Sequence, residues 1–119
     1  MKRILRASLH TLNGLRFAAS SEAAFREEVI ALVIAVPLAF VIATDNWTRL
    51  ALIGSVLALM IVELLNTAIE KLADRVTMDH DPAIGRVKDM GSAAVGLTLL
   101  LAGLVWLLAI WERVSGWLG

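Results

Sequence analysis

The chain has 119 residues, of which 59% are hydrophobic, and 11 Lys and Arg residues balance 11 Asp and Glu residues. Soluble domains are about 45–50% apolar, and a chain this short has too little interior to cover so much apolar surface. We therefore predict a single domain, residues 1–119, with an all-α integral membrane fold. The charge balance argues against a nucleic-acid partner, and the absence of cysteine excludes a disulfide framework.

Residues 1–20 are predicted to form an amphipathic helix that lies on the membrane surface. Three leucines share one helical face, and basic residues accompany them: Leu5, Leu9 and Leu12, with Lys2, Arg3, Arg6 and Arg16. A signal peptide is the alternative, but His10 and Asn13 interrupt the apolar stretch that it needs. We favour the surface helix.

Three transmembrane helices are predicted to follow, at about 23–44, 49–72 and 90–112. Ser20 or Ser21 is a plausible N-cap for the first of them. Its uncharged part, residues 29–43, is shorter than the ~20 residues that usually span a bilayer. Pro37 lies inside this helix, which a membrane helix tolerates. Residues 90–111 carry no charge and give the clearest span.

Basic residues indicate the orientation of these helices. Nine of the eleven lie in the amino-terminal arm or in the loop between the second and third spans, and only Arg49 and Arg113 lie on the opposite side. The amino terminus and this loop are therefore predicted to be cytoplasmic, in a multi-pass membrane protein. Trp47, Trp111 and Trp117 fall at the outer boundary, where an aromatic belt is expected.

The polar end of the second span is the main candidate site. At 100° per residue its polar side chains fall within an arc of roughly 100° on a helix: Glu63, Asn66, Thr67, Glu70 and Asp74. Like charges in a low dielectric repel, so they need a shared partner such as Mg²⁺, a basic neighbour or bound protons. A charged residue inside a span is a functional candidate by default, although interhelical hydrogen bonding would explain Glu63 and Asn66 separately.

A second candidate site opens the third span at Lys88, Asp89 and Ser92. A helix amino terminus with an adjacent Lys suits phosphate. Membrane topology and an ordinary helix cap explain the same residues equally well. None of the common nucleotide-binding motifs of soluble proteins is present.

These blocks together make the sequence resemble the small bacterial diacylglycerol kinases over nearly its whole length. The resemblance rests on Gly14-Leu15-Arg16, Glu22-Ala23-Ala24-Phe25-Arg26 with Glu28, Glu63-x-x-Asn66-Thr67-x-Ile69-Glu70, Asp74-Arg75 and Lys88-Asp89-Met90-Gly91-Ser92-Ala93-Ala94-Val95. The spacings between the blocks also match. The chain departs from the family at Ala19, where an aromatic residue is usual, and at Val87.

The resemblance implies a homotrimer in which each chain has a surface helix and three spans. It implies transfer of the ATP γ-phosphate to diacylglycerol in the bilayer, with Mg²⁺ as cofactor. The implied roles are Glu63 as general base, Glu22 and Glu70 as metal ligands, Asn66, Lys88 and Asp89 as nucleotide and phosphate ligands, Glu28 and Asp74 as supporting residues, and Glu63 and Ser92 as substrate contacts.

Two alternatives remain open at this point. A related branch of the family phosphorylates undecaprenol, although the sequence from Met90 to Ala94 looks more like the diacylglycerol branch. A small proton- or ion-conducting protein is a different class, with the Glu column as a relay. It would explain Glu63 and Glu70, but it gives no reason for Lys88, Asp89 or the motif at Glu22.

Overall fold

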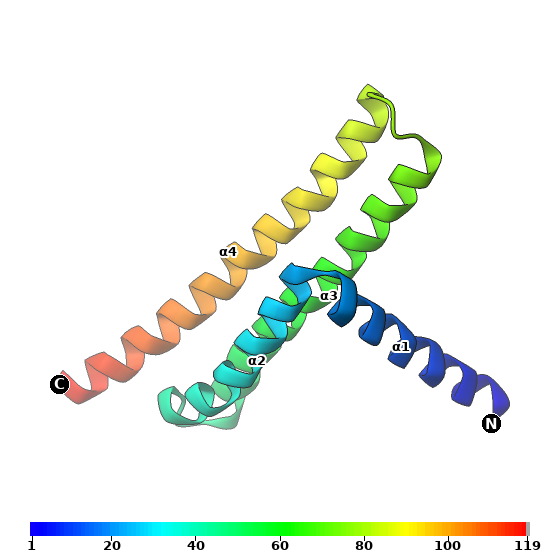
Figure 1. The fold of residues 1–119 in the computed structure, drawn as a ribbon. Helices are drawn as coiled ribbons and strands as arrows, with labels where there is room; N and C mark the ends of the chain where they lie inside the picture. Colours follow the sequence, from blue (N-terminus) through cyan, green and yellow to red (C-terminus); the bar gives the residue numbers. More distant parts are fainter. Residues whose placement is uncertain (119) are drawn as a thin grey trace.

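The computed structural model describes residues 1–118 as α-helices joined by short connections, with no strand among them (Figure 1). The predicted all-α fold is confirmed. The helices are α1 (Lys2–Ser21), α2 (Ala23–Ile42), α3 (Asn46–Val76) and α4 (Pro82–Leu118).

The chain turns sharply between α1 and α2 at Glu22, whose backbone is extended at φ −115° and ψ 111°. The prediction that Ser20 or Ser21 caps α2 is wrong. Both hydroxyl groups donate to the carbonyl oxygen of Phe17, at 2.9 and 2.8 Å, because α1 continues through Ser21. The Arg26 guanidinium donates to the carbonyl oxygens of residues 19 and 20 at 3.0 and 3.2 Å, which ties the end of α1 to α2.

Helix α3 is the centre of the fold, because α2 and α4 both pack along it and touch each other little. Helix α1 leaves the bundle sideways as a separate arm (Figure 1). The most buried packing lies near the α2–α3 turn, where three alanines let the helices approach closely around the fully buried Leu52: Ala39, Ala43 and Ala109. The Trp106 indole of α4 donates to Leu52 O at 3.2 Å and to Ser55 Oγ at 3.0 Å, which fixes α4 against α3.

Helices α3 and α4 extend beyond the predicted spans of 49–72 and 90–112, and side-chain caps explain where they begin. The Asp45 carboxylate accepts from Thr48 N at 3.1 Å at the start of α3. The Asp81 carboxylate accepts from the backbone nitrogens of residues 83 and 84 at the start of α4. Hydropathy marks only the apolar part of a helix. The 37 residues of α4 reach about 55 Å, well beyond a hydrocarbon core of ~30 Å.

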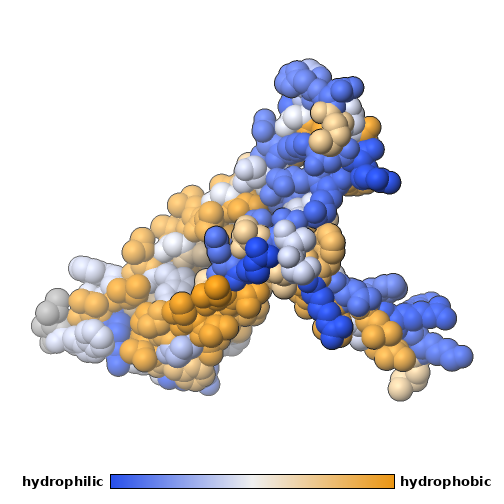
Figure 2. All heavy atoms as spheres, viewed as in Figure 1, coloured by the Kyte–Doolittle hydropathy of each residue, from blue (hydrophilic) through white to orange (hydrophobic). Residues whose placement is uncertain are grey.

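The surface of the molecule is that of a membrane protein. Within the described residues, α3 and α4 are long and apolar enough to cross a bilayer. Figure 2 shows apolar side chains over the body of the bundle, while hydrophilic ones gather at the α3–α4 turn and along the α1 arm. Many large side chains on α2, α3 and α4 are exposed, such as Val33, Leu65 and Leu107. Helix α2 is also strongly apolar, but Arg26, Glu27 and Glu28 in its first turns leave it a shorter uncharged length.

Candidate functional site

The predicted polar column lies on α3 and faces its neighbours. Asn66 is buried, Glu63 is half-buried and Glu70 is exposed, so the column runs from the bundle toward water. Asn66 Nδ2 donates to Glu70 Oε1 at 3.3 Å, one helical turn away. This contact requires the shared face that the periodicity predicts.

Glu22 at the α1–α2 turn and Glu28 on α2 add two more carboxylates to this face. The charge of Glu63 interacts with those of Glu70 and Glu22, and the charge of Glu28 interacts with that of Glu63. Glu28 Oε2 is buried and accepts no hydrogen bond from the described residues. These four carboxylates, together with Asn66, are called the acidic cluster below. It concentrates negative charge in a half-buried place, so it needs bound protons or a cation.

One cation already contacts the acidic cluster. Lys71 Nζ lies 3.0 Å from Glu22 Oε1 and 5.3 Å from the centroid of the Phe17 ring. Lys71 therefore joins α3 to the α1–α2 corner. The sequence does not predict this role, because the spacing within α3 says nothing about a partner outside that helix.

Helix α4 supports the acidic cluster through a glycine. Gly91 is buried, and an added Cβ would overlap Asn66 Oδ1 and lie 3.3 Å from Asn66 Cγ. Asn66 therefore fits only because position 91 has no side chain. Asn66 Oδ1 is itself buried without a hydrogen-bond partner in the described residues, so an acceptor oxygen remains available. The sequence does carry a signal for this contact, because a glycine followed by small residues in a membrane helix is typical of close helix packing.

Lys88 lies further along α4, where its Nζ is 2.6 Å from Asp74 Oδ1. The expectation that Lys88 stands at a helix amino terminus is wrong. Helix α4 begins at Pro82, more than one turn earlier, and Asp81 caps it. A phosphate near Lys88 would thus interact with the Lys88 ammonium, but no free backbone N–H groups of the helix start would lie beside that phosphate.

The structure does not bring every predicted residue to the acidic cluster. Asp89 and Ser92 are exposed on α4, and no hydrogen bond or ion pair joins them to the cluster within residues 1–118. In the same residues, no group of three or more His, Asp or Glu side chains has the geometry to hold a metal ion by itself. Mg²⁺ usually takes only one or two carboxylates and completes its shell with phosphate and water, so Glu22 and Glu70 fit that pattern.

An apolar cavity of about 390 Å³ lies between α1 and α3, directly beside the acidic cluster. Apolar side chains make most of its wall, and Glu22 and Lys71 close its polar side. Its lining includes Leu15, Phe17, Leu64, Thr67 and Ala68. The cavity can accept an apolar group whose polar end faces the carboxylates.

The fold and this site define a small helical membrane protein with a carboxylate–carboxamide cluster beside an apolar cavity. The model of the prokaryotic diacylglycerol kinase family matches residues 9–110. The chain belongs to this family.

Named relatives agree with the family match. The chain is 44% identical over 111 residues to a diacylglycerol kinase of Escherichia coli strain K12, covering 93% of this chain and 91% of that protein. It is 41% identical over 106 residues to a diacylglycerol kinase of Pseudomonas aeruginosa, covering 89% and 86%. A diacylglycerol kinase of Haemophilus influenzae is 36% identical over 106 residues, covering 89% and 90%.

Proposed function

We propose that this chain is an integral-membrane lipid kinase that transfers the γ-phosphate of ATP to the free hydroxyl of diacylglycerol, which gives phosphatidate. Membership of the family supports the reaction. The observation that carries the proposal is the half-buried Glu63 within an acidic cluster that borders an apolar cavity. That arrangement can hold a lipid hydroxyl near a carboxylate while the acyl chains stay in apolar surroundings.

Phosphoryl transfer depends on positioning and on neutralising charge more than on covalent chemistry. Bound Mg²⁺ would neutralise phosphate charge and align the phosphoryl group with the hydroxyl. Glu22 and Glu70 are the proposed ligands, and the unpartnered oxygens of Glu28 and Asn66 fit a site that gains a cation or a donor when substrate binds.

Glu63 is the proposed general base, because it is the innermost carboxylate of the α3 column and is half-buried. Asn66, Lys88 and Asp89 are proposed nucleotide and phosphate ligands, Glu28 and Asp74 support them, and Ser92 contacts the substrate with Glu63. Lys71 pairs with Glu22 at 3.0 Å, and Lys88 pairs with Asp74 at 2.6 Å. Both lysines are therefore placed to exchange that partner for phosphate.

The membrane setting is part of the proposal. Helices α2, α3 and α4 would cross the inner membrane within a single domain, and α1 would lie on its cytoplasmic surface, as the basic residues of the arm indicate. The working unit would be a homotrimer. A single chain leaves many large apolar side chains exposed, and partner chains would cover some of them.

Purified chain in bilayers, supplied with γ-labelled ATP and one lipid at a time, tests the proposal. We expect label in phosphatidate when diacylglycerol is present, and much less in undecaprenyl phosphate when undecaprenol replaces it. Preferential labelling of undecaprenol would assign the chain to the related branch. Proton or ion flux in sealed vesicles without label in either lipid would favour a conducting protein.

A further inference from the structure

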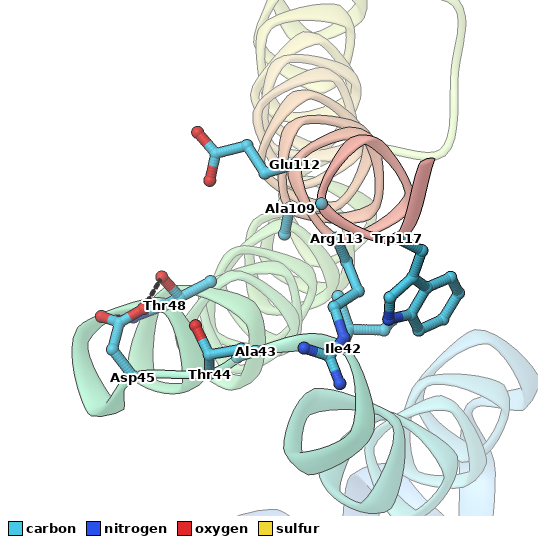
Figure 3. Close-up of a pocket in the computed structure, with 10 residues that line it drawn as sticks. Ile42, Ala43, Thr44, Asp45, Thr48, Ala109, Glu112, Arg113 and Trp117 are labelled. Carbon is cyan, nitrogen blue, oxygen red and sulfur yellow. Dashed lines mark hydrogen bonds between the residues drawn. The ribbon is translucent and has the colours of Figure 1, made fainter. Parts of the chain in front are cut away.

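A second pocket lies at the end of the bundle opposite the acidic cluster. It has a volume of about 320 Å³ and is formed by the end of α2, the α2–α3 turn and the last turns of α4 (Figure 3). The proposed kinase reaction uses none of its residues. The residues that carry the argument are Asp45, Thr48, Arg113 and Trp117.

Arg113 makes the cationic wall of this pocket. Its guanidinium lies 5.2 Å from the centroid of the Trp117 ring, and Figure 3 shows it reaching from α4 toward the end of α2. Arg113 Nε is buried without a hydrogen-bond partner, and the guanidinium forms no ion pair within residues 1–118. A desolvated guanidinium donor without an acceptor is costly, and phosphate oxygens match its planar donors well.

Arg49, the other basic residue at this end, is bonded differently. It donates to Asn46 Oδ1 at 2.9 Å and to Ala43 O at 3.4 Å, and it lies over the Phe40 ring. Within residues 1–118, Arg49 Nε is buried without a hydrogen-bond partner, as Arg113 Nε is, but the terminal nitrogens of Arg49 are already used. Arg49 does not line the pocket, so it provides a control for the loss of one positive charge at the same end.

The opposite wall of the pocket is acidic. Asp45 accepts from Thr48 N at 3.1 Å and from Thr48 Oγ1 at 2.6 Å, and these hydrogen bonds lower the pKa of the Asp45 carboxyl. Asp45 is thus ionised at neutral pH. In Figure 3, Asp45 lies across the pocket from Arg113 and Trp117, and the Glu112 side chain points outward from α4, away from Arg113. The pocket is therefore positive on one side and negative on the other.

The pocket lies at a depth where a lipid headgroup is the expected dipolar ligand. It lies where the apolar lengths of α2, α3 and α4 end, and Trp47, Trp111 and Trp117 are exposed around this end. Tryptophan is enriched at the headgroup level of membranes. A group held between Arg113 and Asp45 at that depth lies at the level of lipid phosphates.

We propose that this pocket binds the headgroup of a zwitterionic phospholipid with a primary ammonium, of the phosphatidylethanolamine class. Arg113 donates to the phosphate, and the ammonium donates to the carboxylate of Asp45. A choline headgroup has no N–H group to donate, and a glycerol headgroup brings no positive charge. Phosphatidylcholine and phosphatidylglycerol should therefore bind less well. The site is separate from the proposed reaction and depends only on the membrane setting.

The test is lipid retention by the full-length chain, measured by native mass spectrometry after exchange into phosphatidylethanolamine, phosphatidylcholine or phosphatidylglycerol. Wild type should retain phosphatidylethanolamine preferentially. Arg113→Gln should weaken its binding by about tenfold or more, because charge-assisted hydrogen bonds are lost. The matched Arg49→Gln variant should retain it, and kinase turnover should stay within about twofold of wild type in both variants if the two sites are independent.

A second measurement needs no variant. In ¹⁵N-arginine protein reconstituted with phosphatidylethanolamine, lipid ³¹P should dephase one arginine Nε signal in the solid-state NMR spectrum. The absence of any such contact would overturn the proposal. Equal loss of retention in Arg113→Gln and Arg49→Gln would also overturn it, by indicating general surface electrostatics. So would equally strong binding of free phosphoethanolamine or inorganic phosphate, or a cross-link that places a second copy of the chain over Arg113.

Discussion

Among single residues, Glu63 bears most directly on the proposed chemistry. It is half-buried on α3, and the charges of Glu70 and Glu22 act on it. Glu63→Gln preserves the shape of the side chain and removes its basicity, so turnover should fall by roughly 10² or more. Binding of ATP should persist, because the variant leaves Asn66 and Lys88 in place. Turnover and nucleotide binding are both measured on the purified chain.

Glu27→Gln is a suitable control for that variant. Glu27 is exposed on α2, and its charge acts on Glu28 rather than on Glu63, so Glu27→Gln removes one nearby charge and leaves the proposed base unchanged. Near-normal turnover in Glu63→Gln, or an equal loss in Glu27→Gln, would contradict the assignment of Glu63 as the base.

Gly91 gives a second prediction about a single residue. A Cβ at position 91 would overlap Asn66 Oδ1, so Gly91→Ala must displace Asn66 or separate α3 from α4. Overpacking of this kind costs about 1–3 kcal/mol of stability. The displacement of Asn66 should also weaken its hydrogen bond to Glu70. We expect a lower unfolding temperature and a large loss of turnover. Both can be measured in detergent.

Gly96→Ala is the matched control, because Gly96 lies in the same helix and an added Cβ there meets nothing within 4 Å. Alanine is a better helix former than glycine by up to ~1 kcal/mol, so this variant should be neutral or slightly more stable. Similar behaviour of the two variants would contradict the packing role of Gly91.

Among the contacts between helices, those of Lys71 join α3 to the corner of α1 and α2. Its ammonium pairs with Glu22 at 3.0 Å and therefore competes with any cation for that carboxylate. Lys71→Gln removes the competitor, so half-maximal activity should require less Mg²⁺. The same change removes the cation from the Phe17 ring, so α1 should become more mobile. A Mg²⁺ titration of activity and protease cleavage of α1 measure the two effects.

Arg75→Gln controls for the loss of charge at this end of α3. Arg75 lies one turn beyond Lys71 and forms no ion pair within residues 1–118. An equal shift of the Mg²⁺ titration in both variants would indicate a general surface effect and would refute direct competition at Glu22.

The start of α3 gives a prediction about pH. Hydrogen bonds from the Thr48 hydroxyl and backbone lower the pKa of Asp45 in the folded state, whereas the unfolded value is about 3.9. The stabilisation from ionised Asp45 is therefore complete above that unfolded value and is lost as the pH falls through the lower folded value. Asp45→Asn keeps a capping side chain but does not titrate.

The difference in unfolding temperature between wild type and Asp45→Asn should therefore be constant near neutral pH and shrink below about pH 4. Thermal unfolding in detergent from pH 7 to pH 3 measures it. A constant difference over the whole range would refute a contribution from the ionisation of Asp45.

The sequence predicts elements and faces better than it predicts contacts between elements. The column from Glu63 to Glu70 follows from helical periodicity, which is local, and the hydrogen bond of Asn66 agrees with it. The caps at Asp45 and Asp81 extend α3 and α4 past their apolar lengths, and hydropathy does not report caps. The partner of Lys71 and the place of Gly91 depend on how α1 and α4 pack against α3, which no local pattern encodes.

For the molecule as a whole, the acidic cluster is the feature that favours an oligomer over a single chain. The central helix α3 is covered by α2 and α4 on parts of its surface only, and Leu57, Ile61 and Leu65 remain exposed on it. Lipid can cover such side chains, but it cannot satisfy carboxylates, which must face protein or water. We therefore expect an oligomer whose sites draw residues from more than one chain.

Subunit mixing tests this expectation. Inactive Glu63→Gln chains are co-assembled with inactive chains altered at Glu22, Glu70 or Lys88. If a site combines residues of two chains, some mixed oligomers contain one site without any altered residue. At least one pairing should then regain activity, up to about a quarter of wild type at equal mixing if a complete site needs one specific neighbour. If every pairing stays at the level of its parents while mixed oligomers demonstrably form, each site belongs to a single chain.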